Sequence, residues 1–217
     1  RDEKILTAWN ALTIKAMARA TRVLARPDYL ASAQSALDFI RRTLWVDGRL
    51  LATAKDGQAH LNAYLDDYAN LLDALLELLQ TRWSGADLRF ALDLAEVLLG
   101  QFQDPAGGGF WFTSRDHEPL IHRPKPLGDE ALPAGNGVAA YALQRLGHLV
   151  GEPRYLAAAQ GTLELAAEAI RGLPHAHATL LFALEDYLEP PETLIIRAAP
   201  GPLADWQRAA QQGYRPR

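Results

Sequence analysis

The sequence of 217 residues contains no cysteine, only one methionine and no run of five or more basic residues. The missing cysteines exclude disulfides, thiolate catalysis and cysteine-ligated zinc within this chain. A formal net charge of -4 without a basic tract argues against nucleic acid as a partner. No apolar run reaches the roughly 18 residues of a membrane span, and the first residues lack the apolar core of a signal peptide. We therefore expect a cytoplasmic protein with no cofactor and with neither nucleic acid nor a membrane as its partner.

Helical periodicity dominates what the sequence does contain. Hydrophobic residues make up 49% of the chain, enough for a real core, and the abundant alanine and leucine favour helix. Apolar residues recur at intervals of three and four, which is the pattern of one buried helix face. This pattern predicts seven helices, at about residues 3–25, 27–44, 62–81, 84–102, 134–150, 153–170 and from after 174 to about 188.

Three alanines occupy equivalent places in the second, fourth and sixth predicted helices, namely Ala33, Ala91 and Ala159. Each repeat consists of a long helix, a short turn, a second helix and a glycine-rich loop. One such hairpin cannot bury both of its faces alone, so neighbouring hairpins must stack. A solenoid or a closed ring meets this need, and the unequal loops with polar residues gathered at one end favour the ring. The expected fold class is all-α.

The connections between these helices are less regular. Residues 49–61 are predicted to form an irregular loop with a short strand at 49–52. Residues 104–126 form a long loop with three glycines followed by Phe110-Trp111-Phe112, and loops of this length are usually functional or disordered. After Pro190-Pro191, a short strand at 194–196 and a small helix at 203–212 predict an αβ tail over residues 191–217.

One segment, Pro124 to Ala140, is the strongest candidate for the wall of a site. Two acids, Asp129 and Glu130, lie in its Pro- and Gly-rich part, and a helix begins directly after them. A loop that ends at a helix start directs free N–H groups and the positive end of the helix dipole toward whatever lies in front of it.

In a ring of hairpins, the odd-numbered helices of this chain would be the inner ones. Polar and aromatic side chains gather near the first half of each of them, and such a gathering suits a sugar site. Aromatic faces stack on sugar C–H groups, while carboxylates and amides bind hydroxyls or transfer protons. The residues concerned are Trp9 and Asn10, then Tyr64, Asp66, Asp67 and Tyr68, then Asn136, and finally His175 and His177.

Each of these residues also has a plainer interpretation. The acids Asp66 and Asp67 can cap or stabilise the first turn of their helix. Asn136 is interpreted more readily as an N-cap than as a catalytic amide, and Trp9 more readily as a core residue. The sequence separation of His175 and His177 would place their rings about 200° apart on a helix, so we predict no metal site.

The loop residues of the candidate site have a plain alternative as well. Asp129 and Glu130 can form ion pairs with Arg123 or Lys125 instead of acting on a substrate. The aromatic triplet around Trp111 can serve as a hydrophobic plug as easily as a sugar platform.

Four segments together resemble a known family: Asp2 to Asn10, Tyr64 to Ala69, Gly108 to Thr113, and Arg123 to Asn136. In this order they resemble the thioredoxin-domain-containing proteins of the YyaL and spermatogenesis-associated type. The resemblance implies that residues 1–190 are the C-terminal part of an (α/α)6 six-hairpin barrel, similar to N-acylglucosamine 2-epimerases and six-hairpin glycosidases. It also implies a thioredoxin-like domain upstream in the same protein. The chain departs from the family pattern at Ala11 and Ala134, where the family often has glycine and serine.

The resemblance and the gathered polar residues lead to three hypotheses. The first is a carbohydrate-active barrel, either a hydrolase or an epimerase, in which hydrolysis would pair an acid of the third helix with one of the loop. The second is a non-catalytic barrel that binds a sugar or a protein, and the third is a helical-repeat scaffold. Whether the chain is an enzyme stays open. The candidate catalytic residues are Asp66, Asp67, Asp129 and Glu130, and the candidate substrate-binding residues are Trp9, Asn10, Tyr68, Trp111, Arg123, Lys125, Asn136 and His175.

Overall fold

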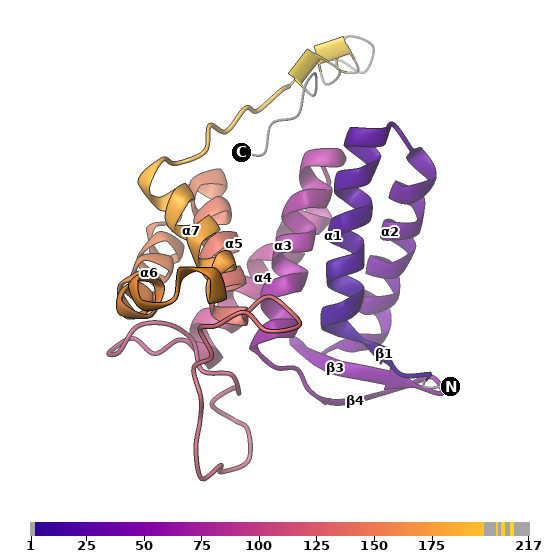
Figure 1. The fold of residues 1–217 in the computed structure, drawn as a ribbon. Coiled ribbons are helices and arrows are strands. Elements are labelled where there is room, and N and C mark those ends of the chain that lie inside the picture. Colours follow the sequence, from indigo (N-terminus) through magenta and orange to yellow (C-terminus); the bar gives the residue numbers. More distant parts are fainter. Residues whose placement is uncertain (1–2, 198–202, 204, 207–208, 211–217) are drawn as a thin grey trace.

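The computed structural model describes residues 3–197 together with Leu203, Asp205, Trp206, Ala209 and Ala210. Seven α-helices within these residues form antiparallel hairpins joined by loops (Figure 1). Their bounds are α1 (Thr7–Leu24), α2 (Pro27–Phe39), α3 (Leu65–Thr81), α4 (Gly85–Val97), α5 (Gly135–Val150), α6 (Pro153–Gly172) and α7 (Ala178–Leu188).

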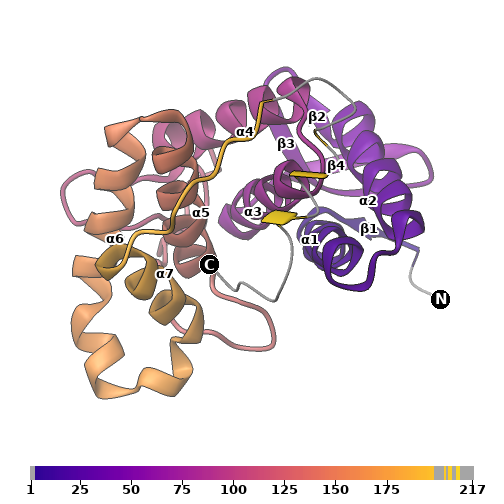
Figure 2. The same ribbon diagram turned by 90° about the horizontal axis from the view of Figure 1, so that it is seen from above.

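The helices form two layers of a partial ring. Helices α1, α3, α5 and α7 pack side by side in sequence order, and α2, α4 and α6 each pack on the preceding inner helix (Figure 2). This is the arrangement of a partial (α/α)6 barrel, so the all-α prediction and the assignment of the odd-numbered helices to the inner layer are confirmed. No helix among the described residues is both long enough and apolar enough to cross a membrane.

The outer helices share the features that the sequence repeat predicted. Ala33, Ala91 and Ala159 are all fully buried, because a small side chain lets each outer helix approach its neighbours closely. Both α2 and α4 also end in a π-helical turn, Ile40–Leu44 (η1) and Leu98–Phe102 (η2), which buries the last residue of each turn. The repeat is therefore visible in the packing as well as in the sequence.

The helices begin and end at residues whose side chains or backbone conformations favour a helix terminus. Pro27 and Pro153 each occupy the first position of an outer helix, where the missing N–H costs nothing. The hydroxyl of Ser84 accepts a hydrogen bond from the Asp87 N–H at 3.2 Å and caps α4. Gly151 ends α5 with a positive φ of 72°, a conformation that glycine adopts without strain.

A small antiparallel sheet lies beneath the N-terminal ends of α1 and α3 (Figure 1). Strand β3 (Arg49–Lys55) pairs with all three others, which are β1 (Ile5–Leu6), β2 (Trp45–Val46) and β4 (Gln58–Asn62). Two turns, Asp47-Gly48 and Asp56-Gly57, have positive φ at both residues, as two-residue hairpin turns require. The loop predicted over residues 49–61 is therefore mostly a hairpin, and only its first strand was foreseen.

Two other parts of the chain differ from the sequence prediction, and in a third, the helix predicted at 203–212, the five described residues are helical. Residues 174–176 form a short 3-10 turn (η3), and α7 begins only at Ala178. The strand predicted at 194–196 is not formed, because residues 191–197 have no regular structure. Much of the helix predicted at 203–212 lies outside the described residues.

Candidate functional site

The N-terminal ends of the four inner helices lie at the same end of the partial ring, those of α1 and α3 above the small sheet and those of α5 and α7 near the loop that precedes α5 (Figure 1). Each helix start exposes backbone N–H groups and a partial positive charge. Carboxylates are therefore stabilised where several helix starts come together. Three aspartates occupy this place, and we call them the aspartate belt: Asp66, Asp67 and Asp129.

Asp67 connects α3 to α1. One carboxylate oxygen accepts a hydrogen bond from the Ala8 N–H at 2.9 Å, and the other accepts one from the Tyr64 N–H at 2.9 Å. The side chain is 5% exposed, and no cation of the described residues pairs with it. Burial raises the pKa of Asp67 to about 7, with a smaller contribution from the neighbouring Asp66 charge and against the two N–H donors. A carboxyl group with a pKa near neutrality can exchange protons at physiological pH.

Asp66 lies on the other side of α3 and faces the start of α5. A Cβ atom placed on Gly135 would lie 2.2 Å from the Asp66 Oδ1, so the glycine is what allows this close approach. Burial raises the pKa of Asp66, and the Gly135 N–H partly counters it. The Oδ1 atom is buried and accepts no hydrogen bond among the described residues. Asp66 is therefore the residue of the aspartate belt that has a carboxylate oxygen without a hydrogen-bond donor.

Asp129 connects α5 to α7. Its Oδ1 accepts a hydrogen bond from the Ala134 N–H at 2.9 Å, and its Oδ2 accepts one from the Thr179 N–H at 2.8 Å. The Asp129 N–H in turn donates to the Ala176 carbonyl at 2.7 Å. The neighbouring acid Glu130 is exposed, and its side chain has no partner among the described residues.

The belt therefore joins successive inner helices around the ring, from α1 through α3 and α5 to α7. Asp67 and Asp129 each use both carboxylate oxygens on backbone N–H groups, and for Asp67 this matches the capping interpretation. The alternative interpretation, ion pairs of Asp129 or Glu130 with Arg123 or Lys125, is wrong, because within the described part of the chain these side chains have other contacts or none.

The two basic residues of the loop have other partners. Lys125 donates to the Asp104 carboxylate at 2.5 Å and to the Gly108 carbonyl at 2.8 Å. Arg123 donates to the Thr113 carbonyl at 2.6 Å. Both cations also lie over the ring of Trp111, with Lys125 Nζ 4.4 Å and the Arg123 guanidinium carbon 5.2 Å from its centroid. The loop is therefore folded around Trp111, which is half-buried.

Asn136 holds this loop against α5. Its side chain accepts a hydrogen bond from the Phe110 N–H at 2.7 Å and donates to the Phe110 and Pro126 carbonyls, both at 2.9 Å. The residue is fully buried, and Ala134 occupies the N-cap position of α5. The N-cap interpretation of Asn136 was therefore wrong. Its amide bonds instead to backbone groups of the loop, at Phe110, 26 residues earlier in the chain, and at Pro126.

The aromatic residues of the inner helix ends have different environments. Tyr68 is fully buried, and its hydroxyl accepts a hydrogen bond from the Leu50 N–H at 2.8 Å, which anchors the sheet to α3. Tyr64 stacks on Phe112 with ring centroids 5.0 Å apart. Trp9 is 59% exposed, so the core interpretation of this residue was wrong. Next to it, the Asn10 amide donates to the Leu6 carbonyl at 2.8 Å within its own helix start.

The two histidines before α7 lie in separate environments. His175 is exposed in the 3-10 turn, and the buried His177 bonds through Nδ1 to the Leu173 carbonyl at 2.8 Å. Neither is on α7 itself, so the helical spacing argument does not apply to them. Among the described residues, no group of three or more His, Asp or Glu side chains is placed to hold a metal ion.

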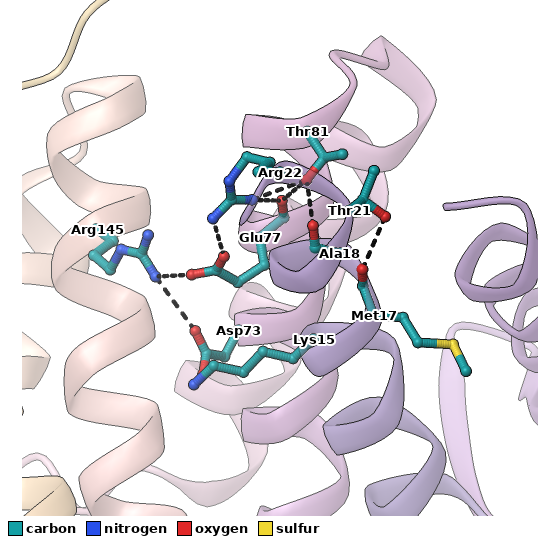
Figure 3. Close-up of polar contacts among 9 residues, drawn as sticks. All are labelled: Lys15, Met17, Ala18, Thr21, Arg22, Asp73, Glu77, Thr81 and Arg145. Carbon is teal, nitrogen blue, oxygen red and sulfur yellow. Dashed lines mark hydrogen bonds and ion pairs between the residues drawn. The ribbon is translucent and has the colours of Figure 1, made fainter. Parts of the chain in front are cut away.

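The sequence interpretation missed a second set of polar residues farther along the inner helices. Lys15 and Arg22 of α1, Asp73 and Glu77 of α3 and Arg145 of α5 form a network, which we call the charge cluster (Figure 3). Lys15 and Arg22 each approach a carboxylate at 2.5 Å, whereas Arg145 lies 3.5 Å from Asp73 and 3.4 Å from Glu77.

A signal for this cluster was present in the sequence. The α3 helix carries four polar residues at intervals of four, three and four, which places them within about 60° of arc on one helix face. The apolar residues of α3 were recognised, but the polar stripe opposite them was not. The stripe consists of Asp66, Asn70, Asp73 and Glu77.

The amino-acid sequence of the chain is similar to those of several named proteins. No protein-family model matches the chain. It is 29% identical over 194 residues to human spermatogenesis-associated protein 20, covering 84% of this chain and 25% of that protein. The rat protein of the same name is 28% identical over 210 residues, covering 92% and 27%. The chain therefore spans about a quarter of the length of these relatives, and the resemblance seen in the sequence motifs is confirmed.

The solved structures that are similar show the fold. An α-mannanase from Bacteroides thetaiotaomicron superposes with a TM-score of 0.70 at 12% identity, over 97% of this chain and 57% of that one. Cellobiose 2-epimerase from Spirochaeta thermophila superposes with a TM-score of 0.61 at 19% identity, over 75% and 43%. An α-1,6-mannanase from Salegentibacter gives 0.60 at 16% identity, over 75% and 47%. That last structure is an inactive variant, with two consecutive aspartates replaced by alanine, in complex with α-1,6-mannotetrose.

Proposed function

We propose that this chain, which resembles spermatogenesis-associated protein 20 and shares its fold with sugar epimerases and mannanases, is the ligand-binding barrel part of a carbohydrate-active protein. One observation carries the proposal: at the end where the inner helices begin, the Asp66 side chain is only partly buried, and its carboxylate is not saturated by backbone N–H groups as those of Asp67 and Asp129 are. A sugar hydroxyl is a natural donor to a partly exposed carboxylate that still has acceptor capacity.

The comparison with the mannanase supports this placement. Its inactive variant lacks two consecutive aspartates. In the present sequence, Asp66 and Asp67 are the only two aspartates that follow one another directly. They start the second inner helix and have raised pKa values, since burial outweighs the hydrogen bonds that they accept. We assign Asp66 to contact with the substrate and Asp67 to holding the ends of α1 and α3 in place.

The chemical step that fits the pair is proton transfer. Burial raises the pKa of Asp66, so this residue can act as acid or base toward a bound sugar, and the neighbouring Asp67, whose pKa is about 7, exchanges a proton beside it near neutral pH. Epimerisation and hydrolysis both need such a group. For hydrolysis a second carboxylate is required, and the exposed Glu130 is the candidate whose side chain is not already bonded to the backbone.

A second function also has support, namely sugar binding without turnover. Asp67 and Asp129 are saturated by backbone N–H groups, and Asn136 is saturated by loop backbone groups. These three residues are thus fully engaged in holding the structure. A barrel with one spare carboxylate oxygen can bind a hydroxyl without being able to break a glycosidic bond.

The test uses the intact protein and a panel of glucose, mannose, cellobiose, cellotetraose and α-1,6-linked mannotetraose. Binding is measured by calorimetry, and conversion of each sugar is followed by chromatography. For a catalytic site we expect Asp66→Asn to lower kcat/KM by about 100-fold or more with the fold intact. The matched control is Asp93→Asn, an exposed aspartate on the outer helix α4.

The outcomes separate the two functions. Binding that is lost in Asp66→Asn, without conversion of any sugar by the wild type, identifies the non-catalytic barrel. Wild-type protein that neither binds nor converts any member of the panel contradicts both. The resemblance further leads us to propose a thioredoxin-like domain upstream in the intact protein and a cytoplasmic location, and fractionation of cells with an antibody to this chain tests the location.

A further inference from the structure

The acids of the charge cluster lie on the same face of α3 as Asp66, about two to three helical turns farther along. Asp66 and Asp73 are seven residues apart, so their backbones are about 10 Å apart along the helix axis. The opposite face of α3 carries Tyr68, whose ring lies 5.2 Å from that of Phe102 in the outer layer. The cluster therefore faces away from the outer helices, toward the space between α1 and α5.

The acidic side chains of the charge cluster are buried, whereas its basic side chains are partly exposed. The side chains of Asp73 and Glu77 are 2% and 5% exposed, but that of Lys15 is 31% exposed. Arg145 is 15% exposed, and both of its ion-pair contacts use one nitrogen at 3.4 to 3.5 Å. Charge-assisted hydrogen bonds are usually about 2.7–2.9 Å long, so the donors of Arg145 are only weakly used.

An aromatic side chain completes the region. Tyr141 precedes Arg145 by one helical turn, is half-buried, and lies between Lys15 and Arg145 at 5.8 and 5.0 Å from its ring centroid. Its hydroxyl makes no hydrogen bond to the described residues, and burial raises its pKa, so it remains a neutral O–H group. A phenol and a guanidinium with spare donors thus lie side by side.

We propose that Tyr141, Arg145, Lys15 and Asp73 form a second carbohydrate subsite, so that the protein binds an oligosaccharide that reaches from Asp66 to Arg145. This inference rests on the proposed function of the Asp66 site. The cluster favours a neutral ligand, because an anion would meet Asp73, Glu77 and Asp186, whose charges act on Arg145, and a cation would meet Lys15, Arg22 and Arg145. Hydroxyl groups use donors and acceptors alike.

The test compares the monosaccharides and tetrasaccharides of the same panel by calorimetry on the intact protein. We expect the wild type to bind a tetrasaccharide more tightly than its monosaccharide. Tyr141→Phe removes only the hydroxyl and is expected to weaken tetrasaccharide binding by about 3- to 10-fold, with monosaccharide binding unchanged. Arg145→Lys keeps the charge but loses the forked donors, and it is expected to weaken tetrasaccharide binding by about 10-fold.

Matched controls exist in the outer layer. Tyr155→Phe removes a hydroxyl that donates to Glu96 at 2.7 Å between α6 and α4, and Arg154→Lys alters an exposed ion pair between the same two helices. Both are expected to leave sugar binding unchanged. Equal affinity of the wild type for both sugar lengths, or equal weakening of both by Tyr141→Phe, overturns the second subsite and leaves the Asp66 proposal standing. A wild type that binds neither length overturns the proposed function itself.

Discussion

The aspartate belt and the charge cluster bury acids on the same helix in two different ways. In the belt, Asp67 accepts two backbone N–H groups without a cation beside it in the described part of the chain, and burial raises its pKa to about 7. In the cluster, burial alone would raise the pKa of Glu77, but Arg145, Arg22 and Lys15 together lower it. The comparison shows that neighbouring cations, and not burial alone, decide whether a buried acid stays ionised at neutral pH.

The difference has a functional consequence. A group that stays ionised can hold a ligand or a neighbouring helix, whereas a group that titrates near pH 7 can also move a proton. Helix α3 therefore offers proton exchange at its N-terminal end and fixed charges farther along. Substitutions at the N-terminal end of α3 and in the charge cluster test this difference between the two parts of the helix.

Removing a carboxylate from the cluster should have the largest effect on stability. Glu77→Ala leaves Arg22 and Arg145 largely buried with one acid fewer, and we expect a loss of about 3–5 kcal/mol in the free energy of unfolding. Denaturant titration measures it. Glu96→Ala is the control, because this acid is about half exposed and pairs with Arg154 at the surface, where ion pairs contribute about 0–1 kcal/mol. Similar losses in the two variants would contradict the cluster's structural role.

The close approach in the belt should be sensitive to one added methyl group. In Gly135→Ala the new Cβ would lie 2.2 Å from Asp66 Oδ1 and 2.8 Å from the Leu65 side chain, and we expect a loss of about 1–3 kcal/mol. Thermal unfolding measures it. In the control Gly100→Ala the Cβ meets no atom within 4 Å, so stability should stay the same or rise slightly.

The two acids should give pH dependences of opposite sign. The pKa of Asp67 is about 7 in the folded chain, above the usual aspartate value of about 3.9, so the folded state binds the extra proton. Its contribution to stability is present at low pH and is lost as pH rises from about 4 to 7, by up to about 1.4 kcal/mol per pH unit. The pKa of Glu77 is lowered, so its contribution is present at neutral pH and is lost as pH falls below the usual glutamate range.

Thermal unfolding between pH 3 and 8 separates these two contributions. Asp67→Asn should flatten the decline between pH 4 and 7, and Glu77→Gln should flatten the loss at acidic pH. A decline above pH 4 that persists unchanged in Asp67→Asn would show that another group causes it.

The smallest effect is expected at the exposed margin of the cluster. Lys15→Ala removes a cation that is 31% exposed, and Arg145 remains near Asp73, so we expect a loss of about 1 kcal/mol. Denaturant titration measures it, with Lys55→Ala on the exposed end of β3 as the neutral control. A loss as large as that of Glu77→Ala would mean that Arg145 does not compensate Asp73.

The sequence predicted much of the fold because helix periodicity is a local property. Six of the seven helices were placed within a few residues, and Ser84, Pro27 and Pro153 marked their starts through chemistry confined to one turn. The hairpin β3–β4 was missed in part because its residues are not strongly alternating. Its Asp-Gly turn was a signal that could have found it.

The candidate site was predicted less well. Asp66, Asp67 and Asp129 were correctly expected near converging helix starts, but their donors come from other helices, as the Ala8 N–H does for Asp67. The partners of Lys125 and Asn136 were also distant in the chain. No local pattern records which of several acids a lysine will meet once the hairpins have stacked.

By itself, the sequence determined the helices, their apolar faces and the order of the hairpins, because these follow from side-chain spacing over a few turns. Only the tertiary structure decided which acids are saturated by N–H groups, which keep a free oxygen and which lie beside cations. Those properties depend on the distance between helices that are 50 to 60 residues apart in the chain, such as Asp129 to Thr179 and Asp67 to Ala8. The protonation of a buried carboxyl group follows from that distance, since desolvation and Coulomb attraction both act through space.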